Sequence, residues 1–327
     1  MIHETLSVSQ VALPEQQMYD WQPFPLALEC RTASATLPQV TAWLATQRDD
    51  LLAQAGICGA ILFRGFPLAT PVDFDGFVAA FGLENFPYDQ SLSNAVRVNR
   101  TPRVFTANEA PASVTIFLHH EMAQTPIFPS RLFFFCEQAA ASGGATPLCR
   151  SDILWQQLVE RCPQFAQACA ERGLRYTNVM PPAADVTSGM GRSWQSTLRA
   201  DSREQAEQRL KTLGYEWQWL DDGCLRATTP RLPAVRDLGA GRRSFFNQLI
   251  AAYHGWKDTR NDPAKAIVHG DGTPLDAQAV ATVAELAEGL TFDIPWQTGD
   301  VALVDNFVTM HGRRPFSGIR RVLASLT

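Results

Sequence analysis

Two histidines and a glutamate, His119, His120 and Glu121, end a run of strand-forming residues in the segment V-T-I-F-L-H-H-E-M, residues 114–122. Successive side chains of a β-strand point to opposite faces, so positions i and i+2 share a face. This spacing predicts that His119 and Glu121 lie together and that His120 lies on the other face. An imidazole and a carboxylate on one face of a strand are two ligands that a metal site could use.

A third ligand must come from elsewhere in the chain, and His311 is the candidate. It lies between the apolar segment G-D-V-A-L-V-D-N-F and the turn-like segment G-R-R-P-F-S-G. Two histidines and one carboxylate form a facial set that suits Fe(II) and leaves three adjacent positions open. No cysteine lies near either motif, which argues against a structural zinc site. Taken singly, each residue also has an ordinary reading, as a hydrogen-bonded strand histidine, a solvated glutamate or a loop histidine.

The composition is that of an ordinary globular protein. The chain has 327 residues, a formal net charge of −5 and 46% hydrophobic residues. No run of Lys and Arg appears, which argues against a nucleic-acid partner. No apolar stretch approaches the about 18 residues that a membrane span needs, and the N-terminus lacks the pattern of a signal peptide. The seven cysteines form no C-x-x-C pair. These features predict reduced thiols and a cytoplasmic location.

The pattern of elements predicts a mainly β protein with outer helices. Strand signals dominate from about Val114 onward, and no β-α-β alternation occurs. We expect one domain over 1–327, with an extended arm at 1–35 and helical insertions around 181–243 and 273–290. Helices are predicted at 37–55 with Gly56 as a C-cap, from Thr70-Pro71 onward, at 152–161, after Ser202 and at 276–288. Residues 85–110 are predicted to be a long irregular segment. Strands are predicted at 59–66, 114–122, 130–137, 172–180, 215–220, 224–228, 244–246 and 299–307 and near the C-terminus.

Several motifs together resemble one family. They are L-H-H-E-M, F-P-S-R-L-F-F-F-C-E, G-G-A-T-P-L and the ending W-Q-T-G-D-V-A-L-V-D-N-F-V-T-M-H-G-R-R-P-F-S-G-I-R-R-V-L. They are similar to the taurine/2,4-D (TauD/TfdA) group of Fe(II)- and 2-oxoglutarate-dependent dioxygenases. The match is closest to the syringomycin-biosynthesis-like and clavaminate-synthase-like branch, which has H-x-E in place of H-x-D. The resemblance runs from about Gly59 to the C-terminus, with poorly matched insertions between about Pro181 and Arg243.

The resemblance implies a double-stranded β-helix (jelly-roll) core in which His119, Glu121 and His311 bind iron. It also implies that Thr146 and an arginine of the last strand hold the distal carboxylate of 2-oxoglutarate. A guanidinium forks onto a carboxylate and a hydroxyl donates to it, which agrees with that role. The arginine is Arg320 or Arg321. These neighbours face opposite sides of a strand, and spacing does not decide between them; we favour Arg321.

The activity implied by the resemblance is hydroxylation of an unactivated C–H bond. Fe(II) is the cofactor, 2-oxoglutarate and dioxygen are co-substrates, and succinate and CO2 are released. Halogenases of this superfamily lack the carboxylate ligand, so Glu121 favours hydroxylation over halogenation. The glutamate is longer than the usual aspartate and could shift the open positions. Desaturation and ring closure therefore stay open as alternative reactions at this site.

Residues near the metal motifs are candidates for substrate binding. Arg313 could meet a substrate carboxylate or hold its own turn through a salt bridge. Gln124 could point into the cavity or cap a loop. Asn306 and Asn247 could support the site or serve ordinary structural hydrogen bonding. The relatives suggest an amino acid as the substrate, free or presented by a carrier protein, in secondary metabolism. The identity of the substrate stays open, because one fold hosts many functions. The sequence does not give the oligomeric state either.

Two other classes of function compete with this reading. A redox-inactive metallohydrolase could use the same three ligands, and it would work without dioxygen. A non-catalytic, cupin-like metal-binding or sugar-binding protein could share the jelly roll. That class gives no reason for Thr146 and the terminal arginines to accompany the metal motif.

Overall fold

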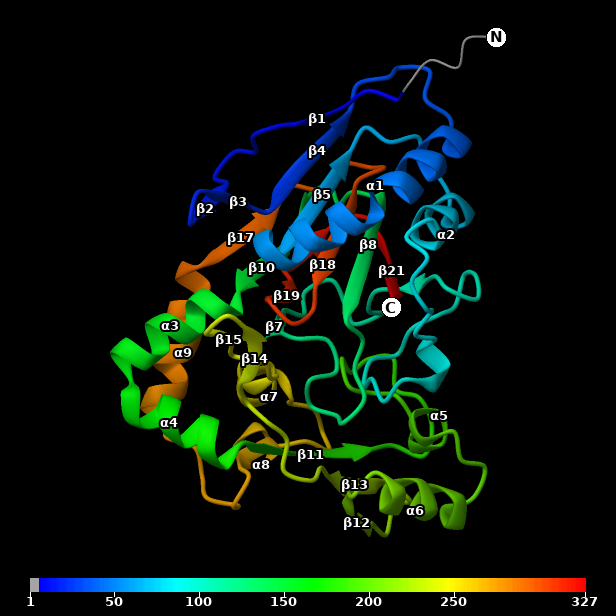
Figure 1. The fold of residues 1–327 in the computed structure, drawn as a ribbon. Helices are drawn as coiled ribbons and strands as arrows, with labels where there is room; N and C mark the ends of the chain where they lie inside the picture. Colours follow the sequence, from blue (N-terminus) through cyan, green and yellow to red (C-terminus); the bar gives the residue numbers. More distant parts are fainter. Residues whose placement is uncertain (1–5) are drawn as a thin grey trace.

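Two β-sheets packed face to face form the core of the computed structural model, which describes residues 6–327 (Figure 1). In order, the larger sheet contains β1 (Val8–Gln10), β4 (Leu26–Cys30), β5 (Ala60–Arg64), β18 (Val301–Asp305), β8 (Arg131–Gln138), β21 (Arg321–Leu326) and β6 (Phe105–Thr106). The smaller sheet contains β17 (Thr291–Ile294), β10 (Thr146–Arg150), β19 (Thr309–Arg313) and β7 (Ile116–His119). This is the jelly-roll core expected from the sequence.

Apolar side chains on the inner faces of the two sheets fill the space between them. Leu62 and Phe134 of the larger sheet pack with Leu148 and Phe292 of the smaller one, and all four are almost fully buried. Neighbours such as Phe63 point to the outer face of the larger sheet, where a second apolar cluster lies. Each such side chain contributes about 1.5–3 kcal/mol when it is fully buried. The central strands are covered on both faces, which is why their sequences are continuous runs of apolar residues.

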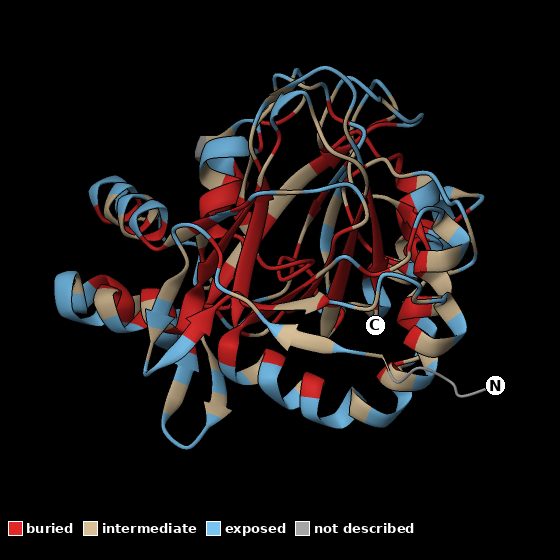
Figure 2. Cartoon of the chain, turned by 90° about the horizontal axis from the view of Figure 1, so that it is seen from above, coloured by how far each residue is buried: buried red, intermediate tan, exposed pale blue. Residues whose placement is uncertain are grey.

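Helices cover the outer face of each sheet. The larger sheet is covered by α1 (Leu37–Cys58) and α2 (Pro71–Ala79). The smaller sheet is covered by α3 (Ser151–Arg161), α4 (Pro163–Arg172), α7 (Leu249–Gly255) and α9 (Ala277–Gly289). Figure 2 shows that these helices turn buried residues toward the sheets and exposed ones outward. Residues 273–290, predicted to be helical, contain α9, and Asp276 caps that helix by accepting hydrogen bonds from the backbone N–H groups of Gln278 and Ala279.

The end of α1 differs from the prediction. The sequence suggested a helix to Ala55 with Gly56 as its cap, but the helix continues to Cys58 and Gly59 follows it. Gly59 has φ +87, a conformation that favours glycine. A Cβ there would also lie 2.5 Å from Thr309 Oγ1. The choice of cap depends on this tertiary contact, which helical periodicity does not report.

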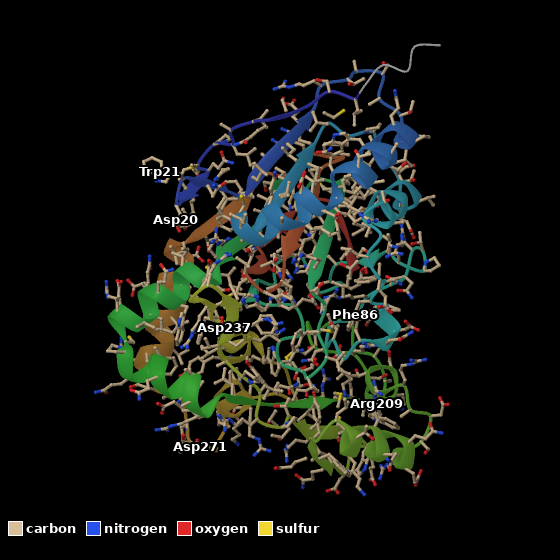
Figure 3. The ribbon with its side chains drawn as sticks, viewed as in Figure 1. Asp20, Trp21, Phe86, Arg209, Asp237 and Asp271 are labelled. Carbon is tan, nitrogen blue, oxygen red and sulfur yellow. The ribbon has the colours of Figure 1, made fainter. Side chains whose placement is uncertain are left out.

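The N-terminal segment is more ordered than an extended arm over 1–35. The first five residues lie outside the described part of the chain. Leu26–Cys30 forms β4, which pairs in parallel with β5 inside the larger sheet, and β1 pairs with its other edge. The strands β2 (Gln17–Tyr19) and β3 (Gln22–Phe24) form a hairpin with Asp20 and Trp21 at its tip (Figure 3). The alternating apolar residues of L-A-L-E-C account for the strand that was not predicted.

The insertion predicted to be helical around 181–243 contains strands as well. A third sheet has the order β12 (Glu216–Trp219), β13 (Leu225–Thr228), β11 (Leu174–Met180) and β16 (Ile267–His269). Beside this sheet lie α5 (Trp194–Leu198), α6 (Arg203–Thr212) and α8 (Pro263–Ala266). The chain after β13 forms a separate hairpin of β14 (Arg236–Gly239) and β15 (Arg242–Ser244). Ser202 caps α6 as predicted, since its side chain accepts from the backbone N–H of Gln205. The strands β12 and β13 were predicted at 215–220 and 224–228, so the description of this insertion as helical was incomplete but its strands were expected.

Short elements complete the chain. They are η1 (Tyr88–Gln90) and the two-stranded pair of β9 (Ser142–Gly143) with β20 (Phe316–Ser317). Long irregular segments join η1, β6 and β7, as the loop-rich sequence of residues 85–110 predicted. In the part of the chain that the structure describes, no helix combines the length and apolarity needed to span a membrane.

Candidate active site

Adjacent strands bring His119 and His311 together although they are far apart in the sequence. Strands β7 and β19 are antiparallel neighbours, and His311 is directly opposite His119 in their register. The two imidazole ring centroids are 4.3 Å apart. Ligand atoms of His119, Glu121 and His311 all lie within 4.8 Å of one another. The structure thus assembles the three side chains that the sequence selected as metal ligands.

The backbone around Glu121 is not the strand that the sequence suggested. Strand β7 ends at His119, and Glu121 lies in a turn that continues through Met122, which has φ +56. The side chain of Asn306 holds this turn. Its Oδ1 accepts from Glu121 N at 2.8 Å, and its Nδ2 donates to the carbonyls of Glu121 and Pro129 at 3.0 and 2.8 Å. Asn306 is fully buried, so its prediction as a substrate-binding residue is wrong; it positions Glu121.

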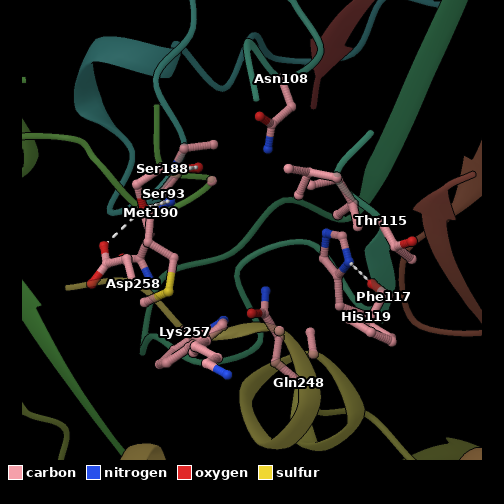
Figure 4. Close-up of a pocket in the computed structure, with 18 of the residues that line it drawn as sticks. Ser93, Asn108, Thr115, Phe117, His119, Ser188, Met190, Gln248, Lys257 and Asp258 are labelled. Atoms are coloured by element: carbon pink, nitrogen blue, oxygen red, sulfur yellow. Dashed lines mark hydrogen bonds between the residues drawn. The ribbon is translucent and has the colours of Figure 1, made fainter. Parts of the chain in front are cut away.

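His119 presents one defined nitrogen to the site. Its Nδ1 lies 2.7 Å from the carbonyl oxygen of Phe117 (Figure 4). A carbonyl can only accept, so Nδ1 carries the proton and donates it, which leaves the Nε2 lone pair available. Burial lowers the pKa of His119 to about 4, and the nearby His311 contributes in the same direction. The imidazole is therefore neutral near pH 7, the form that binds a metal.

His120 points away from this cluster, as predicted. Its ring packs against Phe246 with the centroids 4.7 Å apart, and its Nδ1 bonds to the backbone carbonyl of Asn306. Burial lowers the pKa of His120 to about 3. The backbone carbonyl of Asn247 accepts from His120 N, and the Asn247 side chain bonds to Ala234 O and Leu249 N. Asn247 therefore has the structural role that was weighed against a functional one.

Arg97 contacts the carboxylate of Glu121 and was not found from the sequence. Its Nη2 donates to Oε1 at 2.9 Å and to Oε2 at 3.1 Å. Burial disfavours the charged form of Glu121, but Arg97 and His311 outweigh burial and hold the pKa of this carboxyl well below its usual range. The Arg97 guanidinium packs over the ring of Phe105 at 5.3 Å. Arg97 lies in an irregular segment, where no periodicity marks it as a site residue.

A small cavity connects the metal cluster with Thr146 and Arg320. Its lining includes all three candidate ligands together with these two residues. Arg320 Nη2 lies 3.3 Å from Thr146 Oγ1, and Arg320 Nε donates to the carbonyl of Gly144 at 2.7 Å. Trp296 Nε1 also donates to Thr146 Oγ1, at 3.0 Å. Burial, reinforced by the neighbouring Arg313, lowers the pKa of Arg320 to about 10, so it stays charged near neutral pH.

The preference for Arg321 over Arg320 is wrong in this structure. The side chain of Arg321 is exposed and does not line the small cavity, whereas Arg320 and Val322 both do. The pairing of β21 with β8 is irregular between Arg321 and Val322, and Arg320 comes just before the strand, so regular strand alternation does not by itself place these arginines.

Arg313 is occupied by the backbone of a neighbouring loop. Its two terminal nitrogens donate to the carbonyls of Ala110, Pro111 and Val114 at 2.9, 2.7 and 2.8 Å. Arg313 is buried and forms no salt bridge within the described residues. The salt bridge expected in the turn is therefore absent among the described residues. Arg313 also lines the small cavity, and a contact with substrate stays a prediction. Arg313 fixes the loop that precedes β7, and Val114 of that loop lines the larger cavity.

We expect Arg313→Met to lower the free energy of unfolding by about 2–4 kcal/mol, because it leaves several buried carbonyls without donors. Urea unfolding followed by circular dichroism measures this loss. The matched control is Arg314→Met at the next position, whose side chain pairs with Glu288 and Asp293 on the surface. Such pairs contribute at most about 1 kcal/mol. Equal losses in the two variants would contradict the anchoring role of Arg313.

A larger cavity of about 350 Å³ adjoins the metal cluster (Figure 4). Both cavities are lined by Arg97, Asn108, Ile116, His119 and Glu121. The remaining wall combines amides with apolar groups, including Gln124, Gln248, Phe117, Met190 and Trp256. Gln124 lines this cavity, one of the two placements that the sequence left open, and its buried Oε1 has no hydrogen-bond partner among residues 6–327. A donor on a bound molecule could satisfy that oxygen.

The donor set fits iron. Two imidazoles and one ionised carboxylate match the ligands that non-haem Fe(II) oxygenases use, with positions left open for other ligands. The nearby guanidinium of Arg320 and hydroxyl of Thr146 suit a carboxylate group. Both sets of residues face the same cavity.

Comparisons with known proteins agree with this site. Residues 22–327 match the family model described as taurine catabolism dioxygenase TauD, TfdA family. A clavaminate synthase-like protein of Arabidopsis thaliana is 40% identical, and the alignment covers 98% of each chain. The dapdiamide synthesis protein DdaC of Enterobacter agglomerans is 27% identical over 85% of this chain and 84% of that protein.

The fold likeness extends to solved structures. An asparagine oxygenase in complex with Fe(II), hydroxyasparagine and succinate has a TM-score of 0.55 and 14% identity, with 91% of this chain and 86% of that chain covered. Taken with the family match, this establishes the class of enzyme: the chain belongs to the TauD/TfdA family and is a non-haem oxygenase that uses Fe(II), 2-oxoglutarate and dioxygen.

Proposed function

We propose that the protein hydroxylates an unactivated C–H bond of a small polar substrate, an amino acid that is free or bound to a carrier protein, in secondary metabolism. Succinate and CO2 are the other products. The observation that carries this proposal is the shared cavity of His119, Glu121, His311, Thr146 and Arg320, which adjoins the larger cavity. The name of the related dapdiamide synthesis protein supports a role in making a specialised metabolite.

In this proposal His119, Glu121 and His311 hold the iron, and Thr146 with Arg320 binds the distal carboxylate of 2-oxoglutarate. When bound, the iron and the co-substrate activate dioxygen for C–H oxidation. The Thr146 hydroxyl donates one hydrogen bond to the carboxylate, and the Arg320 guanidinium donates a charge-assisted one. Trp296 Nε1 donates to Thr146 Oγ1, so the Thr146 proton is free to point toward the co-substrate.

Other residues hold this arrangement in place. The carbonyl of Phe117 fixes the tautomer of His119, and the Asn306 side chain fixes the turn that carries Glu121. Arg313 fixes the loop next to β7. A site whose ligands are held in advance needs little rearrangement during turnover.

The larger cavity defines the size and polarity of the proposed substrate. Its volume of about 350 Å³ lies at the lower end of the range for small-molecule sites. The amides of Asn108, Gln124 and Gln248 offer both donors and acceptors. Such walls suit the ammonium, carboxylate and amide groups of an amino acid. Exposed residues, among them Lys257, also line this cavity, so a carrier-bound amino acid could enter while its carrier stays outside.

The proposal treats residues 1–327 as one oxygenase domain acting in the cytoplasm. All seven cysteines are free thiols, and a reducing compartment keeps them so.

The test is aerobic incubation with Fe(II), 2-oxoglutarate and a panel of free and carrier-bound amino acids. Mass spectrometry should find one substrate that gains one oxygen atom, with an equimolar amount of succinate. A product that instead loses two hydrogens would identify a desaturase or cyclase and overturn the hydroxylation. Substrate conversion without dioxygen would favour a hydrolase.

A further inference from the structure

We propose that Arg97 controls how Glu121 binds the metal, by leaving only one carboxylate oxygen available to it. A single nitrogen, Arg97 Nη2, lies 2.9 Å from Oε1 and 3.1 Å from Oε2 of Glu121. A donor at nearly equal distances from both oxygens lies between them. A cation held by both oxygens would require that same place. This inference rests on the proposed role of Glu121 as a metal ligand.

The guanidinium of Arg97 is built into the protein. Its side chain is only 7% exposed, and it packs against the rings of Tyr88 and Phe105 at 5.9 and 5.3 Å. Its Nε is buried and has no hydrogen-bond partner among the described residues. Within residues 6–327, the hydrogen bonds of the Arg97 side chain reach only the Glu121 carboxylate.

The length of the glutamate gives Arg97 a purpose. Glutamate has one more methylene than aspartate, so its carboxylate has more freedom to turn both oxygens toward a metal. A facial triad with one oxygen from the carboxylate leaves three positions open. With iron bound, these open positions would serve the co-substrates 2-oxoglutarate and dioxygen. A second oxygen from Glu121 would occupy one of these positions, and Arg97 prevents this because its Nη2 already lies between the two oxygens.

The test compares Arg97→Met, Glu121→Asp and the double variant with the unmodified protein. Mn(II) affinity is measured by electron paramagnetic resonance of the free ion. 2-Oxoglutarate affinity is measured anaerobically in the Fe(II) protein from its visible absorption. We expect Arg97→Met to bind Mn(II) but to bind 2-oxoglutarate at least about tenfold more weakly, as is common when a partner of a metal ligand is removed. We expect the double variant to regain most of that affinity, because the shorter aspartate does not need the restraint.

The matched control is Arg192→Met. Arg192 is another buried arginine over the ring of Tyr88, at 4.3 Å, but it donates to the carbonyls of Ser91, Ser93 and Ser196 and not to Glu121. We expect both affinities to stay unchanged in this variant. If Arg97→Met does not fold, as judged by circular dichroism, Arg97→Lys replaces it. A lysine offers a point charge without the planar fork, and we expect an intermediate affinity for 2-oxoglutarate.

Three results would overturn the inference. The first is an unchanged 2-oxoglutarate affinity in Arg97→Met. The second is an Arg97→Met protein that loses Mn(II) affinity as well as 2-oxoglutarate affinity. The third is a double variant whose 2-oxoglutarate affinity is as low as that of Arg97→Met. The proposed function fails separately, if the unmodified Fe(II) protein shows no absorption change with 2-oxoglutarate.

Discussion

The His311→Ala variant is expected to keep its fold and to lose at least about a hundredfold of its 2-oxoglutarate turnover. Removing a group that only orients a metal ligand already costs roughly 10- to 100-fold, and His311 is proposed as a ligand itself. The variant takes away the contribution of β19 to the cluster, since His311 is directly opposite His119. Succinate formation at saturating Fe(II) and 2-oxoglutarate measures the loss, and circular dichroism monitors the fold.

The control for this variant is His254→Ala. His254 is exposed at the end of α7 and is not part of the metal cluster. Its removal should leave succinate formation within about twofold of the starting value, as surface substitutions usually do little. Full activity of a folded His311→Ala protein would remove His311 from the set of ligands.

The second prediction separates two adjacent arginines. Replacing Arg320 with methionine should weaken 2-oxoglutarate binding by about 10- to 100-fold, because a charge-assisted hydrogen bond contributes about 1.5–3 kcal/mol. The same change at Arg321 should alter binding by less than about twofold, because that side chain is exposed and lies outside the small cavity. Anaerobic titration of the Fe(II) protein with 2-oxoglutarate provides both dissociation constants.

Because the two residues are neighbours of the same type, this pair is its own control for charge and composition. A larger effect at Arg321 than at Arg320 would restore the preference drawn from the sequence. Equal effects would indicate that the arginines act only through the overall charge near the cavity mouth.

The metal cluster was predictable because each of its two histidines lies in a short, recognisable sequence segment. The run L-H-H-E-M marks one strand, and the segment V-T-M-H-G marks another. Strand alternation assigned His119 and His120 to opposite sides correctly, although β7 ends at His119. Glu121 reaches the cluster for a different reason, which is the turn held by the Asn306 side chain. The prediction for Glu121 was therefore right in position and wrong in mechanism.

The remaining residues depend on contacts that no local pattern reports. Arg97 donates to Glu121 from an irregular segment. Arg313 donates to carbonyls of a loop far earlier in the chain, and one of them, that of Val114, is 199 positions away. An arginine next to a motif looks the same in the sequence whether it faces a substrate or a loop. To choose between Arg320 and Arg321, one must know which side of the strand faces the small cavity, and Val322 marks that side. That side follows from packing against the opposite sheet.

The most direct test of the central claim is the visible absorption of the anaerobic Fe(II) protein during addition of 2-oxoglutarate. If His119, Glu121 and His311 hold iron next to Thr146 and Arg320, a weak charge-transfer band should grow and saturate with one equivalent of 2-oxoglutarate. The band should be missing from the folded His311→Ala protein. A protein that binds Fe(II) yet develops no band, or a band that persists without His311, would contradict the account.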